Sequence, residues 1–275
     1  MCLIVFDWRP RAGTGALLTL TANRDEFFAR ASAPLDWWND APGVLAGRDL
    51  VGAGTWLGLA RDGRFAALTN HRDPQAFRPD APTRGALVAD YLKGQRLTPL
   101  DYLHEIAERG AAYNGFNLVV GDFTRRELAW YCNRSDTAPS LLPAGVHGIS
   151  NAVLDTPWPK LVRKRAELGD LLEREGEPRL DALIELMRDP CIAADETLPS
   201  TGISLERERA LSAAFIETAD YGTRGTTALR VVPRGAVLSV QIAERSDDDG
   251  SHRIERPGSY ERRFTFDLPA FSSRD

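Results

Sequence analysis

The sequence has few cysteines, no cysteine pair at metal-binding spacing and no long apolar run, and each lack excludes a class of protein. Among 275 residues only three are cysteines, at positions 2, 132 and 191, and no two of them form a C-x-x-C pair. An odd number of separated cysteines argues against a disulfide framework and against a zinc site. We therefore predict no bound metal, and we interpret Cys132 and Cys191 as buried apolar residues.

The sequence also lacks signals for a membrane or for nucleic acid. The apolar run Leu3 to Phe6 is too short for a signal-peptide core or a membrane span, and no basic segment precedes it. Arginine greatly outnumbers lysine, but acidic residues lie among the arginines and the net charge is −5. A basic surface for nucleic acid is therefore not expected. We predict a cytoplasmic protein without a membrane span.

No linker or repeat divides the chain, and 43% apolar content is enough for a core, so we predict one domain over residues 1–275. Apolar alternation and turn signals predict strands at 2–8, 16–22, 55–60, 65–70, 116–121, 127–132, 226–232, 237–243 and 262–268. Helical spacing and capping signals predict helices at 98–107, 157–175 and 179–188. Strands at both ends with helices between them indicate an α+β fold with largely antiparallel sheets.

Cys2 is the residue with the clearest chemical meaning. If Met1 is removed, Cys2 carries both a nucleophilic thiol and a free α-amine that can act as its own base. Removal is expected because the second residue is small. The alternative is that Cys2 is an ordinary buried residue of an edge strand.

Several short motifs together carry a family resemblance. They are Asn23-Arg24-Asp25-Glu26, Gly54-Thr55-Trp56-Leu57-Gly58, Leu68-Thr69-Asn70, Gly115-Phe116-Asn117-Leu118, His147-Gly148-Ile149-Ser150-Asn151, Pro157-Trp158-Pro159-Lys160 and Tyr221-Gly222-Thr223-Arg224. In this order they resemble the NRDE family, also called the transport and Golgi organisation protein 2 family. Ala53 and Gly225 depart from the family pattern, which usually has glycine and serine there.

The resemblance implies a fold and a set of site residues. Family members resemble N-terminal nucleophile hydrolases, which have a four-layer αββα sandwich, and among these the conjugated bile acid hydrolase and penicillin V acylase branch. Two residues separate the arginine and aspartate of that branch, whereas Arg24 and Asp25 are adjacent. Carried over by motif, the catalytic residues are Cys2, Arg24, Asp25, Asn70, Asn151 and Arg224.

The chemistry of these residue types fits hydrolysis of a non-peptide amide. A guanidinium at Arg24 would lower the thiol pKa, and Asp25 would hold the ammonium. Amide donors from Asn70 and Asn151 would stabilise a tetrahedral oxyanion. Arg224 would bind a carboxylate or phosphate of the substrate, or brace Asp25. The reaction would pass through a thioester on Cys2.

Further polar and aromatic residues of the motifs are candidate contacts for a small or lipid-like substrate. They are Asn23, Glu26, Trp56, His147 and Trp158. Each has a structural alternative: Asn23 in a turn, Glu26 paired with Arg24, the tryptophans in the core, and His147 hydrogen-bonded in a turn rather than bound to haem.

A carrier remains the alternative to an enzyme. The same pocket with an inert Cys2 would hold an amphipathic cargo, and the resemblance implies haem trafficking, acyl-coenzyme A metabolism and Golgi organisation as settings. No C-x-x-C-H motif is present, so haem would be a non-covalent cargo and not an attached cofactor. The sequence predicts no cofactor for the hydrolase.

Overall fold

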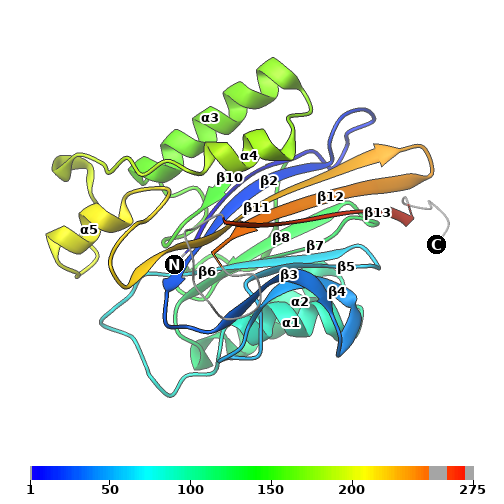
Figure 1. Ribbon diagram of the computed structural model, residues 1–275. Coiled ribbons are helices and arrows are strands. Elements are labelled where there is room, and N and C mark those ends of the chain that lie inside the picture. Colours follow the sequence, from blue (N-terminus) through cyan, green and yellow to red (C-terminus); the bar gives the residue numbers. More distant parts are fainter. Residues whose placement is uncertain (1, 248–258, 270–275) are drawn as a thin grey trace.

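Two antiparallel sheets face each other, and helices cover their outer faces (Figure 1). The structure, a computed structural model, describes residues 2–247 and 259–269. The first sheet has the order β10 (Gly145–Ile149), β1 (Cys2–Trp8), β2 (Leu18–Phe27), β11 (Tyr221–Arg234), β12 (Val237–Ser246) and β13 (Tyr260–Pro269). The second has the order β3 (Ser32–Trp38), β4 (Ala41–Asp49), β5 (Leu57–Ala60), β6 (Arg64–Asn70), β7 (Phe116–Asp122), β8 (Glu127–Cys132) and β9 (Ser140–Leu141).

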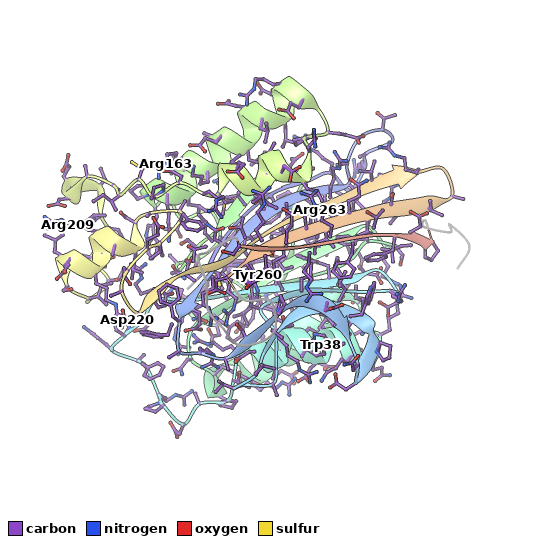
Figure 2. The ribbon with its side chains drawn as sticks, viewed as in Figure 1. Trp38, Arg163, Arg209, Asp220, Tyr260 and Arg263 are labelled. Carbon is purple, nitrogen blue, oxygen red and sulfur yellow. The ribbon has the colours of Figure 1, made fainter. Side chains whose placement is uncertain are left out.

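The helices form two outer layers. They are α1 (Gly85–Lys93), α2 (Pro99–Arg109), α3 (Pro159–Glu175), α4 (Leu180–Leu186) and α5 (Leu205–Leu211), with short 3₁₀ turns η1 (Gly110–Ala112) and η2 (Asp195–Thr197). In the view of Figure 2, Arg163 of α3 marks the upper helical layer, and Trp38 lies toward the lower layer of α1 and α2.

Three apolar clusters show that the layers number four. Ile4 and Phe6 of β1 point inward to the cluster between the sheets, where they meet residues such as Phe65. Leu3 and Val5 point outward to the cluster under α3 and α4. A third cluster lies between the second sheet and helices α1 and α2. Because a strand turns alternate side chains to opposite faces and both faces of β1 are covered, the run Leu3 to Phe6 is apolar on both faces, as predicted. The predicted αββα sandwich is thus confirmed.

Local signals explain why these elements begin and end where they do. The Thr98 hydroxyl accepts a hydrogen bond from the Asp101 backbone at 3.1 Å, and Pro99 occupies the first turn of α2. Gly176, with φ of +66°, ends α3 after Pro159 begins it. The predicted apolar stripe of α4, including Leu183 and Met187, is buried in the core.

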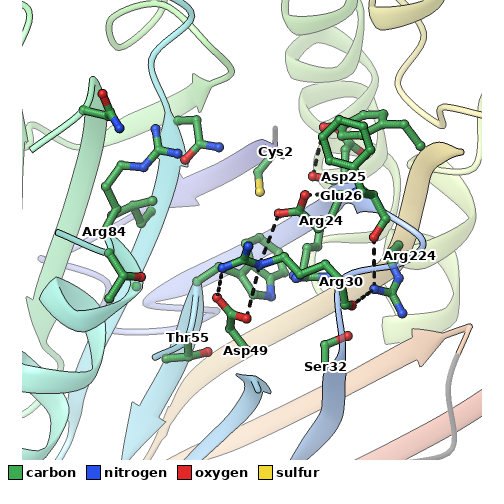
Figure 3. Close-up of a pocket in the computed structure, with 18 of the residues that line it drawn as sticks. Cys2, Arg24, Asp25, Glu26, Arg30, Ser32, Asp49, Thr55, Arg84 and Arg224 are labelled. Carbon is green, nitrogen blue, oxygen red and sulfur yellow. Dashed lines mark hydrogen bonds and ion pairs between the residues drawn. The ribbon is translucent and has the colours of Figure 1, made fainter. Parts of the chain in front are cut away.

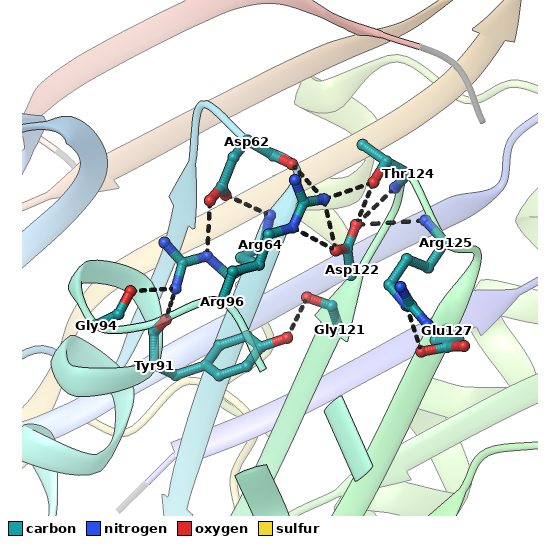
Figure 4. A network of polar contacts seen from close by, with 10 residues as sticks. All are labelled: Asp62, Arg64, Tyr91, Gly94, Arg96, Gly121, Asp122, Thr124, Arg125 and Glu127. Atoms are coloured by element: carbon teal, nitrogen blue, oxygen red, sulfur yellow. Dashed lines mark hydrogen bonds and ion pairs between the residues drawn. The ribbon is translucent and has the colours of Figure 1, made fainter. Parts of the chain in front are cut away.

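A polar network fixes the corner of the second sheet at which β6 begins and β7 ends (Figure 4). The Asp122 carboxylate, which is fully buried, accepts hydrogen bonds from the Arg96 guanidinium at 2.8 Å and from the Thr124 hydroxyl at 2.6 Å. Arg64 donates to the Tyr91 and Gly94 carbonyls. These bonds join α1 to the β5–β6 and β7–β8 connections and satisfy buried polar groups.

Some elements differ from the sequence predictions. Strand β2 runs on to Phe27, so the Asn23 to Glu26 motif lies inside a strand and not after it. Strands β3, β4, β9 and β10 and helices α1 and α5 were not predicted. Within residues 2–247 and 259–269, no helix combines the length and apolar character needed to cross a membrane.

Candidate active site

The site is built on the first residues of β1 and the last residues of β2. Cys2 lies directly opposite Arg24 in the antiparallel register, at the end of the sheet where β2 also pairs with β11. Alternation along β2 directs Arg24 toward the space between the sheets, and directs Asn23 and Asp25 toward the helical layer. The Asn23 amide accordingly donates to the backbone carbonyls of Met187 and Ala214, at 2.9 and 2.7 Å.

A cavity of about 870 Å³ opens at this end of the sandwich (Figure 3). Of the predicted site residues, those that line it are Cys2, Arg24, Asp25, Glu26, Trp56, Asn70 and Arg224. This volume is typical of pockets that hold a drug-sized or cofactor-sized molecule. Both sheets and the connection between β6 and α1 contribute to the wall, so residues far apart in the sequence meet there.

The thiol and the guanidinium are the central pair of the cavity. Burial raises the pKa of the Cys2 thiol and the Asp25 charge raises it further, whereas the Arg24 guanidinium lowers it. Arg24 therefore acts in the predicted direction, but burial outweighs it in the encoded chain. The Arg24 guanidinium has no hydrogen bond or ion pair within the part of the chain that the structure describes. It is thus available to a thiolate or to an anionic group of a ligand.

Asp25 is held from the helical side. Its carboxylate accepts a hydrogen bond from the Thr223 hydroxyl at 2.6 Å, and its backbone carbonyl accepts one from the Tyr221 hydroxyl at 3.0 Å. The carboxylate is 1% exposed. Burial raises the pKa of Asp25, and the nearby Lys160 ammonium is the largest influence that lowers it.

A β-bulge at Arg224 directs its side chain into the wall of the cavity. The register between β11 and β2 shifts between Thr223 and Gly225, which leaves Arg224 as the extra residue. Its guanidinium pairs with Asp247 at 2.9 Å and also donates to the backbone carbonyls of Phe27 and Arg30. Its charge is neutralised inside the protein, so it holds strand ends together instead of presenting a free cation.

The two predicted oxyanion donors have different positions. Asn70 ends β6 and lines the cavity, and its side-chain amide has no hydrogen bond among the described residues. Asn151 is fully buried outside the cavity wall, and its amide donates to the Asn70 backbone carbonyl at 2.9 Å. Asn151 therefore fixes the end of β6, and only Asn70 is placed to meet a ligand.

Sequence reasoning missed a second available cation, Arg84. It lies just before α1 on the opposite wall from Arg24 and donates to the Gly115 carbonyl at 2.9 Å (Figure 3). No carboxylate pairs with it in residues 2–247 or 259–269. By contrast, Arg30, which also lines the cavity, is bound to Asp49 at 2.6 Å. Arg84 belongs to no strand-end motif, so only the folded chain reveals it.

Comparison with known proteins shows the family to which the chain belongs. The sequence model of the family described as Transport and Golgi organisation 2 matches residues 1–248. The chain belongs to this family. The relatives include a Transport and Golgi organization protein 2 homolog of Homo sapiens, 35% identical over 92% of this chain and 96% of the relative. The Bos taurus homolog is also 35% identical, over 90% of this chain and 93% of the relative.

Two solved structures are similar in shape. A mutant conjugated bile acid hydrolase from Clostridium perfringens has 8% identity and a TM-score of 0.47, covering 100% of this chain and 99% of that one. A Caenorhabditis elegans ortholog of N-acylethanolamine-hydrolyzing acid amidase has 11% identity and a TM-score of 0.42, covering 68% and 85%. The predicted membership of the NRDE family is confirmed by the family match.

The remaining candidate residues lie outside the cavity wall in this family member. Asn23 ties β2 to the helical layer, as described above. Trp158 precedes α3, with the Arg72 guanidinium 4.8 Å from its ring centroid. His147 lies on β10, where its Nδ1 is 2.9 Å from Asp155 Oδ2 and its Nε2 is 3.0 Å from the Pro143 carbonyl. Both ring nitrogens face acceptors, so this position offers iron no unused nitrogen.

We expect the stability that His147 contributes to decline as the pH rises. The Asp155 hydrogen bond raises the pKa of His147 above its unfolded value of about 6.5, since the doubly protonated ring donates to both acceptors. This contribution is complete below the unfolded pKa and is lost as the pH rises through the folded pKa. Urea unfolding should show a larger advantage of wild type over His147→Gln at pH ~6 than at pH ~9. The exposed His104→Gln should show no such trend, and a pH-independent difference for His147→Gln would contradict the assignment.

Proposed function

We propose that this protein is an N-terminal cysteine amidohydrolase that cleaves a non-peptide C–N amide of a small or lipid-like substrate. The observation that carries the proposal is the register of β1 and β2. It sets Cys2 opposite Arg24, whose guanidinium has no partner among the described residues, at the wall of a cavity of about 870 Å³. Asp25 and Asn70 border the same cavity.

The proposed reaction starts when Met1, which lies outside the described residues, has been removed. The α-amine of Cys2 takes the proton of its own thiol, and the thiolate, held by Arg24, attacks the amide carbon. The oxyanion that forms accepts a hydrogen bond from Asn70. The C–N bond then breaks as the ammonium returns the proton to the leaving amine. Water hydrolyses the resulting thioester, which releases the acid and restores the thiol; no cofactor is needed.

Arg24 and Arg84 favour a substrate with an anionic group near the scissile bond. They come from opposite walls of the cavity and neither has a carboxylate partner within the described ranges. A carboxylate or phosphate would accept charge-assisted hydrogen bonds from both. In the sequence-based prediction this role belonged to Arg224, but that guanidinium is already bound to Asp247.

Trapping the thioester tests the reaction directly. Intact mass should first show that the purified protein lacks one methionine. Brief incubation with a panel of acyl amides, followed by acid, should then add the mass of an acyl group to the peptide that begins with Cys2. Complete retention of Met1, or tight binding of the panel with neither adduct nor turnover, would contradict the proposal.

The carrier function remains the second candidate, and the raised thiol pKa favours it. A thiol that burial keeps protonated is a poor nucleophile, while the cavity would still hold an amphipathic anion such as haem or acyl-coenzyme A. Under this alternative, Cys2→Ser would bind either cargo as the wild type does.

We expect Arg84→Gln to weaken binding of anionic acyl amides by about ten- to a hundredfold. The loss of a charge-assisted contact is worth about 1.5–3 kcal/mol, which corresponds to that change in affinity. Binding of a neutral acyl ethanolamide should change little. Arg48→Gln is the matched control, because Arg48 also lines the cavity but is paired with Asp40 at 2.5 Å. Equal losses for anionic and neutral ligands would exclude a role for Arg84 in charge recognition.

A further inference from the structure

A buried lysine on α3, the helix that packs on β1 and β10, has no part in the reaction described above. Lys160 lies in the first turn of α3, its side chain is 2% exposed, and its ammonium donates to the Leu211 carbonyl at 2.9 Å. Among the described residues it has no carboxylate at ion-pair distance. Lys164, one turn further along α3 and equally buried, pairs with Glu167 at 2.6 Å and with Asp189 at 2.8 Å.

The position of α3 brings Lys160 to the outer face of the strands that carry the site. Leu161, the next residue, packs against Leu3 and Val5 of β1. The carboxylate of Asp25 lies on this same outer face of the sheet, since it follows Asn23 by two residues on β2. One short segment, 211–216, links the two residues: Lys160 donates to the Leu211 carbonyl, and the Ile216 amide donates at 2.9 Å to the Thr223 hydroxyl that donates to Asp25. Lys160 and Asp25 are therefore two buried, oppositely charged side chains held against the same segment on the outer face of the sheet.

Of the two carboxylates that act on Lys160, Glu208 is already paired with an arginine, so Asp25 is the counter-charge of Lys160. The charged and titratable groups that act on Lys160 are Asp25 of β2, Cys2 of β1, Arg72 of the β6–α1 connection and Glu208 of α5. Glu208 is already paired with Arg72 at 2.5 Å. Those acting on Asp25 are Lys160, the chain's amino terminus, Arg24 and the Thr223 hydroxyl.

The charged form of each of the two buried side chains, Lys160 and Asp25, is stabilised by the charge of the other. Burial lowers the pKa of Lys160 to about 8, and Asp25 is the largest influence that raises it. Burial raises the pKa of Asp25, and Lys160 is the largest influence that lowers it. Removing one partner would leave an uncompensated buried charge, which a protein avoids by neutralising the remaining group.

We propose that Lys160 is a positioning residue that keeps Asp25 ionised, so that Asp25 can hold the α-ammonium of Cys2 during the reaction. The inference rests on the proposed function. When the thiol proton moves to the α-amine, a thiolate and an ammonium form; the carboxylate stabilises the ammonium, and Lys160 stabilises the carboxylate. Lys160 itself contacts neither the substrate nor the thiol.

The ionisation of Asp25 can be followed without any substrate. Protein with ¹³C-labelled aspartate carboxyls is titrated by NMR, and the Asp25 signal is assigned from its loss in Asp25→Asn. Lys160→Gln keeps a donor for the Leu211 carbonyl but removes the charge, and we expect it to move the Asp25 midpoint upward by at least about one pH unit. Lys160→Arg should stay close to wild type, and Lys164→Gln is the matched control for a buried charge on the same helix.

The outcomes separate this proposal from the proposed function. An unchanged Asp25 midpoint in Lys160→Gln, or an equal displacement in Lys164→Gln, would overturn it. If the protein is a hydrolase, the acid limb of its kcat/KM profile should move with the Asp25 midpoint. If no amide is hydrolysed, the NMR result still decides whether the pair exists.

A double-variant cycle covers the case in which Lys160→Gln is too unstable to titrate. If the two residues compensate each other, Asp25→Asn combined with Lys160→Gln should be more stable to urea than the sum of the single changes predicts. Additive losses of stability would refute the coupling.

Discussion

Replacing Cys2 with alanine is expected to abolish hydrolysis of every acyl amide that the wild-type protein turns over, by about 10⁴-fold or more. Neither the thioester nor the thiolate that forms it can exist without the sulfur. The cavity keeps its shape, because Cys2 is a small buried residue at the end of β1. Ligand affinity, measured by isothermal titration calorimetry, should therefore stay close to that of the wild type.

Cys191→Ala is the control for loss of a thiol. The prediction of a buried residue was wrong for Cys191, which is exposed because it lies in the connection after α4, and it does not line the cavity. The Cys191→Ala variant should retain full activity. Turnover that survives in Cys2→Ala would exclude Cys2 as the nucleophile, and it would equally exclude a carrier without catalytic activity. Loss of both turnover and binding would show that the variant had lost its cavity, and circular dichroism would detect such unfolding.

Asn70→Ala is expected to lower kcat by about 10²–10³ and to leave KM nearly unchanged. An oxyanion exists only in the transition state and the tetrahedral intermediate, so its donor contributes little to ground-state binding. Steady-state kinetics on any amide found by screening measures both constants. An increase in KM with kcat unchanged would instead make Asn70 a substrate-binding residue.

Asn114→Ala is the matched control for Asn70→Ala. Asn114 also lines the cavity, but its amide is bound on both sides to the Arg78 backbone, at 2.8 Å each. It should affect stability more than kcat. Asn151→Ala should act on the reaction indirectly, through the Asn70 carbonyl that it holds.

The sequence predicted the elements in which pattern and local chemistry agree. Strand β1, the capped helix α2 and the long helix α3 each combine a clear apolar period with a start or stop signal. Helix α1 was not predicted from the sequence, because it begins at Gly85 with no side-chain cap and no acidic residue in its first turn. Strands β3 and β4 were not predicted, because their irregular pairing register breaks the two-residue alternation of apolar and polar side chains.

The site was predictable to the extent that motifs mark strand ends. Cys2, Arg24 and Asn70 follow from the chain's first residues and from polar residues at the ends of apolar strands. Arg84 and Lys160 could not be predicted in this way, because what distinguishes them is that no carboxylate lies at ion-pair distance among the described residues, and pairing is a property of the folded chain. The same limit applies to Arg224, whose partner Asp247 comes directly after the end of β12. Local motifs name the residue types at a site, and tertiary pairing decides which of them remain chemically available.

The alternation of side chains within β2 has a consequence for how the chain tolerates insertions. Arg24 faces the space between the sheets and Asp25 the helical layer because adjacent residues of a strand alternate, so one residue added within β2 ahead of Arg24 would exchange their sides. A guanidinium would then be buried beneath α3, beside Lys160, and the thiol would face a carboxylate. The turn between β1 and β2 does not have this constraint, since its residues lie outside both strands and their pairing. Insertions should therefore leave folding and activity unchanged in the turn and abolish both within the strands. A scan of single-residue insertions across residues 2–27 would map that boundary.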